Sequence, residues 1–274
     1  MRRRAPGLAR SAKRLLRRCR ERALTALGLR DPLLPPRERM FVGSGDFVAV
    51  GREFAGYLVD LAGLRPDDCL LDVGCGVGRL ALPLTKYLGG RGRYAGFDVV
   101  ADGIAWCQTI TRRFPRFGFR LVDVRNRYYN PQGRLDAATF TFPFPGGSFD
   151  VAVLASVFTH LTPPDAGRYV AEVARALKPG GRCLATFFLL NDESRRLSEA
   201  GRARRRFVAE RDGFATVNPD CPEEATAFDE AGVRLLFARH GLRIEEPVRY
   251  GSWCGRAEFL SHQDVVVAVK EAGA

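Results

Sequence analysis

The chain has 274 residues, 46% of them hydrophobic, which is enough to bury a full core and suits one large α/β domain better than two small ones. No apolar stretch approaches the about 18 residues that a membrane-spanning helix needs, so a span is excluded. The seven cysteines form no CxxC pair and no regular spacing, which argues against a disulfide framework and against a zinc site. We therefore expect reduced thiols, no bound metal and a cytoplasmic protein.

The formal net charge of +12 is concentrated at the N-terminus. Residues 1–37 contain 12 arginines or lysines against Glu21 and Asp31, so this segment carries +10 and residues 38–274 carry only +2. A protein that acts on nucleic acid usually spreads basic side chains over its catalytic face. The distribution argues against RNA or DNA as a substrate and divides the chain into a basic arm, residues 1–37, and a main domain, residues 38–274.

The arm is predicted to form one amphipathic helix within residues 1–30, followed by the helix-breaking sequence DPLLPP. Its apolar residues recur at steps of three and four, with arginines on the opposite face: Leu8, Ala12, Leu15, Leu16, Cys19, Ala23 and Leu27. A secretory signal is not expected, because no long apolar stretch follows the charges. Four roles stay open: peripheral contact with anionic lipid at the inner membrane surface, contact with RNA, targeting, or a solvated arm of the domain.

From residue 46 onward, apolar strands alternate with amphipathic helices. The expected strands are 69–74, 93–98, 117–124, 149–155, 181–190, 243–251 and 263–270. The expected helices are 46–64, 79–88, 101–114, 164–177 and 229–242. Strands separated by helices of about 10 to 15 residues predict a Rossmann-like, doubly wound α/β fold, with a parallel sheet covered by helices on both faces.

One segment, residues 191–226, interrupts this alternation between the fifth strand and the next helix. It is longer than a plain connection requires, so we expect an insertion that acts as a lid over the substrate. Its basic run RARRRF, residues 202–207, is interpreted as a solvated helical face.

The glycine-rich sequence DVGCGVGRL, residues 72–80, follows the first strand, where ligands of such sheets bind. A dinucleotide loop would have a third glycine where Arg79 stands, and a nucleotide triphosphate loop would have a lysine followed by serine or threonine. The leading Asp72 would also repel phosphates. A zwitterionic amino acid that carries a sulfonium has the opposite needs, because it requires a close backbone and an acidic neighbour.

The longer sequence LLDVGCGVGRLALPL, residues 70–84, resembles the first motif of the class I S-adenosylmethionine-dependent methyltransferases. The resemblance continues in the same order through YAGFDVV (94–100), RLVDV (120–124), FPFPGGSFDVAVLASVFTHL (142–161) and ALKPGGRCLATFFLL (176–190). It extends over roughly residues 41–270. Within the class, the chain is similar to the small-molecule branch that includes the ubiquinone and menaquinone biosynthesis methyltransferases.

This resemblance implies a seven-stranded, mostly parallel sheet with an antiparallel last strand, and S-adenosylmethionine as the cofactor. In the family, the acidic residue at Asp98 holds the ribose hydroxyls and the one at Asp123 contacts the adenine amino group; a turn or helix cap is the alternative for Asp123. The implied cofactor-binding residues are Asp72, Gly74, Cys75, Gly76, Gly78, Asp98, Val99, Asp123, Val124 and Ser156.

Two histidines are candidates for a general base, which an oxygen or nitrogen acceptor needs if it must lose a proton. His160 follows the fourth strand at the active-site end of the sheet, and His262 precedes the last strand. A structural role in the following helix is the alternative for His160. His240 stands before Gly241 and is expected to end a helix.

Aromatic residues after the third and fifth strands are candidates for the walls of an apolar acceptor site, although each also suits the core. They are Tyr128, Tyr129, Phe187, Phe188 and Trp253.

The sequence thus predicts an S-adenosylmethionine-dependent methyltransferase that transfers a methyl group to an O, N or C atom of a small-molecule, sugar or lipid-linked acceptor. Three alternatives stay open. The first is an RNA methyltransferase that binds nucleic acid through residues 1–37. The second is a non-catalytic S-adenosylmethionine-binding module, and the third is a nicotinamide oxidoreductase.

Overall fold

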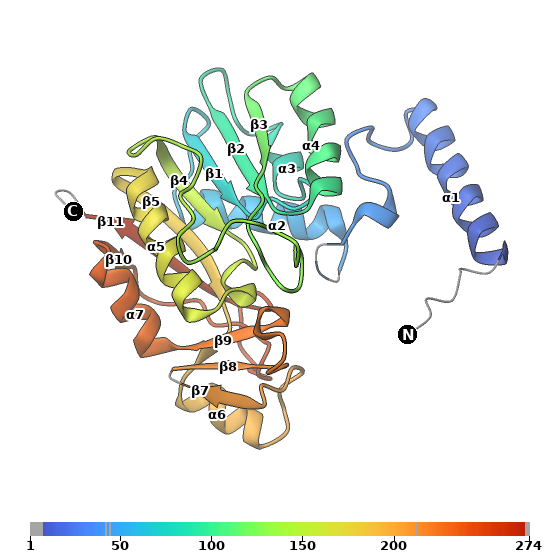
Figure 1. Cartoon of the computed structure of the whole chain (residues 1–274). Coiled ribbons are helices and arrows are strands. Elements are labelled where there is room, and N and C mark those ends of the chain that lie inside the picture. The colour runs from blue at the N-terminus through green and yellow to red at the C-terminus, as the bar shows by residue number, and fades with distance from the viewer. Residues whose placement is uncertain (1–7, 42, 44, 212, 272–274) are drawn as a thin grey trace.

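The computed structural model describes residues 8–41, 43, 45–211 and 213–271, and a seven-stranded sheet organises them (Figure 1). The strands lie in the order β10-β11-β5-β4-β1-β2-β3. They are β1 (Cys69–Val73), β2 (Arg93–Asp98), β3 (Phe117–Leu121), β4 (Phe149–Leu154), β5 (Leu177–Phe187), β10 (Leu242–Ile244) and β11 (Asp264–Lys270). The first five pair in parallel, and β11 runs antiparallel to both β5 and β10. The predicted sheet, including its antiparallel last strand, is confirmed.

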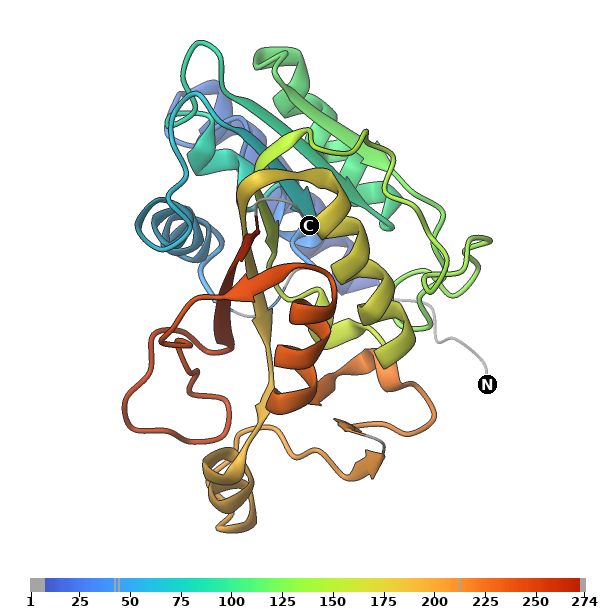
Figure 2. The ribbon, with the colours of Figure 1, turned by 90° about the vertical axis from the view of Figure 1, so that its left-hand side faces the viewer.

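Helices cover both faces of this sheet (Figure 2). One face carries α2 (Phe47–Asp60), α3 (Ala81–Leu84) and α4 (Ala101–Arg113), and the other carries α5 (Pro163–Ala176) and α7 (Glu230–Arg239). Side chains alternate along each strand, so Leu70 packs in the first core and Leu71 in the second. Burial on both faces explains why the parallel strands read as continuous apolar runs.

Local capping sets several of the helix ends. The Asp46 side chain accepts a hydrogen bond from the Ala49 backbone N–H at 2.7 Å and begins α2. Thr162 and Asp165 form a capping box at the start of α5. The helix α7 ends at His240, followed by Gly241 at φ 67°. The prediction for His240 is therefore confirmed, and it follows from the left-handed conformation that glycine adopts without strain.

A second, four-stranded sheet is formed by strands from the segment predicted as an insertion and from its two ends. Its order is β6 (Leu189–Leu190), β9 (Thr226–Asp229), β8 (Phe214–Thr216) and β7 (Ala209–Arg211), and α6 (Asp192–Glu199) packs beside it. The segment has a small core of its own, which includes Phe188, Leu197 and Trp253. It is thus a folded unit of the domain. The prediction of a helical face at residues 202–207 is wrong, because these residues follow the end of α6 and form a loop with a bend at Arg204 and Arg205.

Two predicted elements are shorter than expected. Of the helix expected at 79–88, only α3 is regular; Thr85 N–H bonds to the Ala81 carbonyl in the i−4 pattern and Lys86 N–H to the Pro83 carbonyl in the i−3 pattern. Pro83 has no N–H and so removes one helical hydrogen bond. The strand expected at 243–251 ends at Ile244, shortly before Pro247, which also cannot donate to a ladder.

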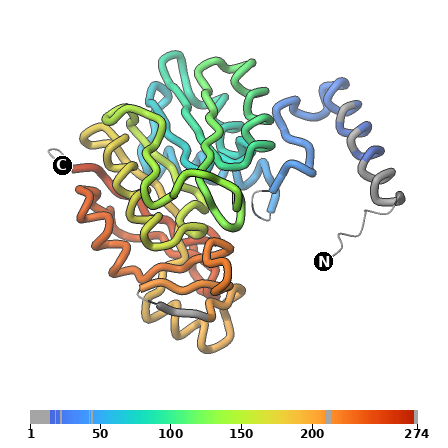
Figure 3. Tube along the Cα trace, viewed as in Figure 1, coloured from blue at the N-terminus to red at the C-terminus, as the bar shows by residue number. Residues whose placement is uncertain are grey.

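The basic arm contains α1 (Leu8–Ala26), which stands apart from the sheet and its covering helices (Figures 1 and 3). Within the part of the chain that the structure describes, no helix is both long and apolar enough to cross a membrane. Three short 3-10 helices complete the fold: Arg37–Arg39, Phe158–His160 and Pro222–Glu224.

Candidate active site

A cavity of about 650 Å³ lies beside the carboxyl ends of β1 and β4. The chain leaves β1 toward β2 and β3 on one side, and β4 and β5 lie on the other, so this is the point at which the strand order reverses. The volume is in the range of small-molecule sites. Nine of the twelve predicted site residues line it: Asp72, Gly74, Cys75, Asp98, Val99, Val124, Ser156, His160 and His262.

The glycine loop has the backbone geometry that its sequence requires. Gly74 has φ 73°, and a Cβ built on it would stand 2.6 Å from Val157 Cγ2. Gly78 has φ 78°, but it does not line the cavity; a Cβ there would approach Ile110 of α4 to 2.9 Å. The absence of a side chain at Gly74 thus lets the loop pack against Val157 at the cavity, whereas its absence at Gly78 lets the loop pack closely on α4. Gly76 also lies outside the lining, and its N–H holds Asp98.

Asp98 lies at the end of β2 with its carboxylate fixed by the backbone. Oδ2 accepts a hydrogen bond from Gly76 N–H and Oδ1 one from Val100 N–H, both at 2.8 Å. Burial raises the pKa of Asp98, and the backbone N–H donors oppose that shift. A carboxylate has about four lone-pair sites, so these donors leave acceptor capacity for ligand hydroxyl groups.

Asp72 is the second buried carboxyl group at the cavity wall, and it is 3% exposed. Burial raises its pKa to about 7, although a hydrogen bond donated by the Tyr94 hydroxyl opposes the shift, and Asp98 adds a smaller upward contribution. A cationic ligand group placed beside Asp72 would favour the ionised form. Near neutral pH, a cationic ligand that binds beside Asp72 would therefore cause its carboxyl group to release a proton.

Asp123 lies beside the cavity and not in its lining. Its carboxylate accepts a hydrogen bond from Arg134 Nε at 2.6 Å, and this pairing lowers the pKa of Asp123. Its backbone carbonyl also accepts from Arg134 N–H and Leu135 N–H. These contacts stabilise the loop after β3. The expected contact with adenine stays a prediction, and the neighbouring Val124 and Asn126 line the cavity.

His160 is held in one tautomer by the inserted segment. Its Nδ1 lies 2.8 Å from the backbone carbonyl oxygen of Glu223, which can only accept, so Nδ1 carries the proton. Nε2 is left as the acceptor, 3.4 Å from the Tyr129 hydroxyl. Burial lowers the pKa of His160, and nearby Arg205 contributes in the same direction. The imidazole is thus neutral at pH 7, as a general base must be.

An aromatic cluster surrounds this histidine. The Tyr128 ring stacks on His160 with ring centroids 5.8 Å apart and an interplanar angle of 11°. The Tyr129 ring meets both His160 and Tyr128 edge-on, and Phe41 lies 6.5 Å from Tyr129. All four residues line the cavity, so the predicted role of Tyr128 and Tyr129 as wall residues is consistent with their position.

Arg205 is a lining residue that sequence reasoning missed, since its basic run was interpreted as a solvated face. Its guanidinium lies 5.5 Å from the centre of the Phe188 ring, and the ring of His262 lies 6.1 Å from that of Phe188. Burial and then Arg205 lower the pKa of His262. The sequence could not single out Arg205, because the other three arginines of the run do not line the cavity.

Two buried polar atoms at the cavity lack a partner. Among the described residues, Arg79 Nε and Thr159 Oγ1 are buried without a hydrogen bond, and both residues line the cavity. Arg79 also places its guanidinium 5.4 Å from the centre of the Phe47 ring. Buried polar groups are normally satisfied, so unpaired ones in a cavity wall are available to a ligand or to water. In the sequence, Arg79 was noted only as the residue that replaces a third glycine.

Ser156 is held in a strained conformation between β4 and the last strand. It has φ 61°, which is unusual for a residue other than glycine and costs about 1 to 3 kcal/mol. Its N–H donates to Thr186 Oγ1 at 2.7 Å, and its hydroxyl donates to Gln263 Oε1 at 2.9 Å. Thr186 also donates to Gln263 Oε1, at 2.6 Å. The Gln263 amide nitrogen is left as a donor at the cavity wall, which the sequence did not indicate.

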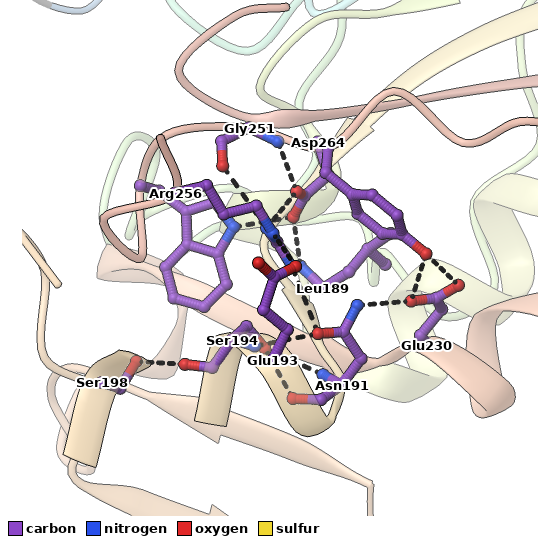
Figure 4. Close-up of polar contacts among 11 residues, drawn as sticks. Leu189, Asn191, Glu193, Ser194, Ser198, Glu230, Gly251, Arg256 and Asp264 are labelled. Carbon is purple, nitrogen blue, oxygen red and sulfur yellow. Dashed lines mark hydrogen bonds and ion pairs between the residues drawn. The ribbon is translucent and has the colours of Figure 1, made fainter. Parts of the chain in front are cut away.

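A buried ionic network joins the two sheets (Figure 4). Asp264, at the start of β11, accepts hydrogen bonds from Leu189 N–H, Gly251 N–H and Trp253 Nε1, each at 2.7 Å. Arg256 Nη1 lies 3.2 Å from Asp264, and Arg256 Nε donates to Glu193 of α6 at 2.8 Å. Burial raises the pKa of Asp264 to about 6. The network fixes the end of the main sheet to the inserted segment.

Two of the aromatic residues expected at the acceptor site are core residues. Trp253 is fully buried in the small core and contacts Phe188 and Phe207. Phe187 stacks on Phe158 in the main core at 4.5 Å. The suggestion that they line the cavity is wrong, because a strand directs successive side chains to opposite sides and only Phe188 points toward the cavity.

Comparison with known proteins agrees with this architecture. Residues 71–185 match the family described as "Methyltransferase domain". The resemblance is thus confirmed, and this part of the chain is a methyltransferase domain of the class I, S-adenosylmethionine-dependent kind.

Several of the similar proteins are named as methyltransferases of small molecules. A Nocamycin O-methyltransferase from Saccharothrix syringae is 35% identical over 143 residues, which cover 51% of this chain and 46% of the relative. A ubiquinone/menaquinone biosynthesis C-methyltransferase from Teredinibacter turnerae is 32% identical over 133 residues, 48% of this chain and 47% of the relative. The chain therefore spans less than half the length of these relatives.

Among solved structures, the 1,6-didemethyltoxoflavin-N1-methyltransferase of Burkholderia thailandensis, determined with its substrate and S-adenosylhomocysteine, has the same fold. It is 16% identical with a TM-score of 0.53, and the match covers 99% of this chain and 94% of that chain.

Proposed function

We propose that the protein transfers a methyl group from S-adenosylmethionine to an oxygen or nitrogen atom of a small-molecule acceptor. The observation that carries the proposal is the cavity, in which two buried carboxyl groups and a glycine loop meet a histidine held in its basic tautomer. The family of residues 71–185 and the small-molecule chemistry named for the relatives support it.

The residues fit the cofactor at the glycine-loop side of the cavity, which we define by Asp72, Gly74, Arg79 and Asp98. Asp72 would bind the ammonium group and the unpaired Arg79 would bind the carboxylate of the methionine portion. The free lone pairs of Asp98 would accept the ribose hydroxyls. When bound, the sulfonium supplies an already activated methyl group.

The acceptor would lie on the aromatic side of the cavity, defined by Tyr128, Tyr129, Phe188 and Arg205, with His160 at its boundary. The chain's task in methyl transfer is to align the acceptor atom with the methyl group and to exclude water. His160 Nε2 would accept the acceptor's proton while Nδ1 stays bonded to the Glu223 carbonyl oxygen. His262, which also lines the cavity, ranks second for this role.

The inserted segment contributes to the acceptor side of the cavity. It contributes Arg205, Glu224 and the carbonyl that orients His160. Its closure over the acceptor as a lid remains part of the proposal, as do a cytoplasmic location and the boundary near residue 37.

Calorimetry with S-adenosylhomocysteine and with NAD tests the cofactor. Binding of the first and not of the second supports the proposal, whereas binding of NAD alone would identify an oxidoreductase. Incubation with S-adenosylmethionine labelled in the methyl group and with cell extracts tests catalysis. A labelled small molecule supports the proposal, labelled RNA favours the nucleic-acid alternative, and binding without any transfer would identify a non-catalytic module.

A further inference from the structure

The apolar side of α1 carries two leucines that stay exposed in the described chain. Leu15 is 63% exposed and Leu16 is 71% exposed. Cys19, three residues after Leu16, and Ala23, four residues after Cys19, are exposed as well. Large apolar side chains aligned at helical spacing are normally buried against a partner. The helix therefore has an apolar face that the domain leaves open.

The same helix is strongly basic. Residues 8–26 contain seven arginines or lysines and one acidic residue. Arg17 and Arg20 are exposed; Arg17 lies across the helix from Cys19, and Arg20 lies at the edge of the apolar side, one turn after Leu16. Neither the first turn of the helix nor the rest of the arm offsets this charge, because residues 1–37 as a whole carry +10.

The chain between α1 and the cavity is anchored to the domain. Leu33 is buried, and its carbonyl accepts a hydrogen bond from Trp106 Nε1 of α4 at 3.3 Å. Arg39 forms an ion pair with Asp102 at 3.3 Å, and its guanidinium lies 5.7 Å from the centre of the Trp106 ring. Two residues further on, Phe41 lines the cavity. A surface that binds α1 would thus be connected to the cavity wall through a segment that is anchored to α4.

We propose that α1 lies in the interface of a bilayer that contains anionic lipid, with Leu15 and Leu16 in the acyl region and the arginines at the phosphate groups. A lipid surface suits both faces of the helix at once, because long basic side chains reach the headgroups while the leucines enter the apolar layer. RNA would engage the basic face alone and would leave the leucines in water. The helix cannot span the bilayer, since seven of its 19 residues are basic.

Sedimentation of the full chain with vesicles tests this proposal. We expect binding to vesicles of equal parts phosphatidylcholine and phosphatidylglycerol, and at least about tenfold weaker binding to pure phosphatidylcholine, because each basic residue near an anionic surface adds affinity. The double variant Leu15→Gln/Leu16→Gln should lose at least about tenfold in partitioning. The variant Arg17→Gln/Arg20→Gln should weaken binding to the anionic vesicles and change little on the neutral ones.

The matched control is Leu235→Gln, which removes an exposed leucine from α7 and should bind vesicles as the unaltered chain does. Equal melting temperatures of all variants would show that the domain still folds. The proposal is overturned if the chain does not sediment with anionic vesicles, or if the double leucine variant binds them unchanged. Binding of single-stranded RNA that survives Leu15→Gln/Leu16→Gln, without vesicle binding, would assign the arm to RNA. The proposal is independent of the methyltransferase function, which the calorimetric experiment tests.

Discussion

The two sides of the cavity are built in different ways. The glycine-loop side comes from two adjacent parallel strands and the loops that follow them, so Asp72 and Asp98 are close because β1 and β2 pair along their whole length. The aromatic side joins segments from distant parts of the chain: Tyr129 after β3, His160 after β4, and Phe188 and Arg205 around the inserted sheet. The first side depends on the register of one strand pair, and the second depends on long-range packing. Substitutions on one side of the cavity should therefore affect different properties from substitutions on the other side.

The largest effect is expected on stability from Asp264→Ala, which acts on the aromatic side through the buried network. The change leaves three donors and the 3%-exposed Arg256 side chain without their carboxylate, and breaking a buried pair costs about 3 to 5 kcal/mol. Urea denaturation measures the loss. Asp67→Ala, which removes an exposed ion pair with Arg91, is the control and should lower the free energy of unfolding far less, because solvent screens that pair. Equal losses in the two variants would mean that the network does not hold the sheets together.

The next largest effect should follow from His160→Asn, which is expected to lower kcat by at least about a hundredfold and to leave affinity for S-adenosylhomocysteine unchanged. Transfer of labelled methyl groups to the extract acceptors measures it. In the unaltered protein, activity should fall only as the pH drops below the ordinary histidine range, because burial lowers the pKa of His160 and the base must be neutral. His240→Asn, at the end of α7, is the control and should behave normally. A variant that keeps full activity would remove His160 from the mechanism.

On the glycine-loop side, Asp98→Ala should weaken binding of S-adenosylhomocysteine by at least about 1.4 kcal/mol, a factor of ten. The carboxylate would be lost both as the acceptor for the ribose hydroxyls and as the group that holds Gly76 N–H and Val100 N–H. Calorimetry measures the affinity. Asp123→Ala is an informative companion, since its ion pair with Arg134 lies outside the cavity lining, and a much smaller effect is expected. If Asp123→Ala were the more damaging change, the placement of the adenosine would be wrong.

The smallest effect is the pH dependence of cofactor binding through Asp72. With a pKa of about 7 in the free protein, this carboxyl group is increasingly protonated as the pH falls. An ammonium group favours the carboxylate, so binding must release a proton at low pH, and affinity for S-adenosylhomocysteine should fall about threefold between pH 7.5 and 6.5. Calorimetry in two buffers of different ionisation enthalpy measures the proton release. Asp72→Asn should bind more weakly and with a flat pH profile; a sloping profile in that variant would assign the proton to another group.

The sequence predicted the parts of the site that are local. The glycines at 74 and 78 require left-handed backbone, and Asp72 and Asp98 end consecutive strands, so parallel pairing alone brings them to one edge. The sequence could not predict where the apolar run 181–190 leaves the main sheet. Every residue of the run after Arg182 is buried, so no change in the apolar pattern marks that point. That point is set by Asp264, 75 positions away from Leu189, which binds the Leu189 N–H and directs the chain into the second sheet.

What the sequence determined by itself is the sheet, the glycine loop and the histidines available for chemistry, since apolar periodicity and special backbone needs are properties of short segments. Only the tertiary structure decided which of these side chains meet. In the folded chain, Arg205 of the basic run lines the cavity and Trp253 is buried in a core. The Glu223 carbonyl oxygen accepts a hydrogen bond from His160 Nδ1. The physical reason is that a hydrogen bond between residues 63 positions apart depends on how separate elements pack, which no local pattern contains.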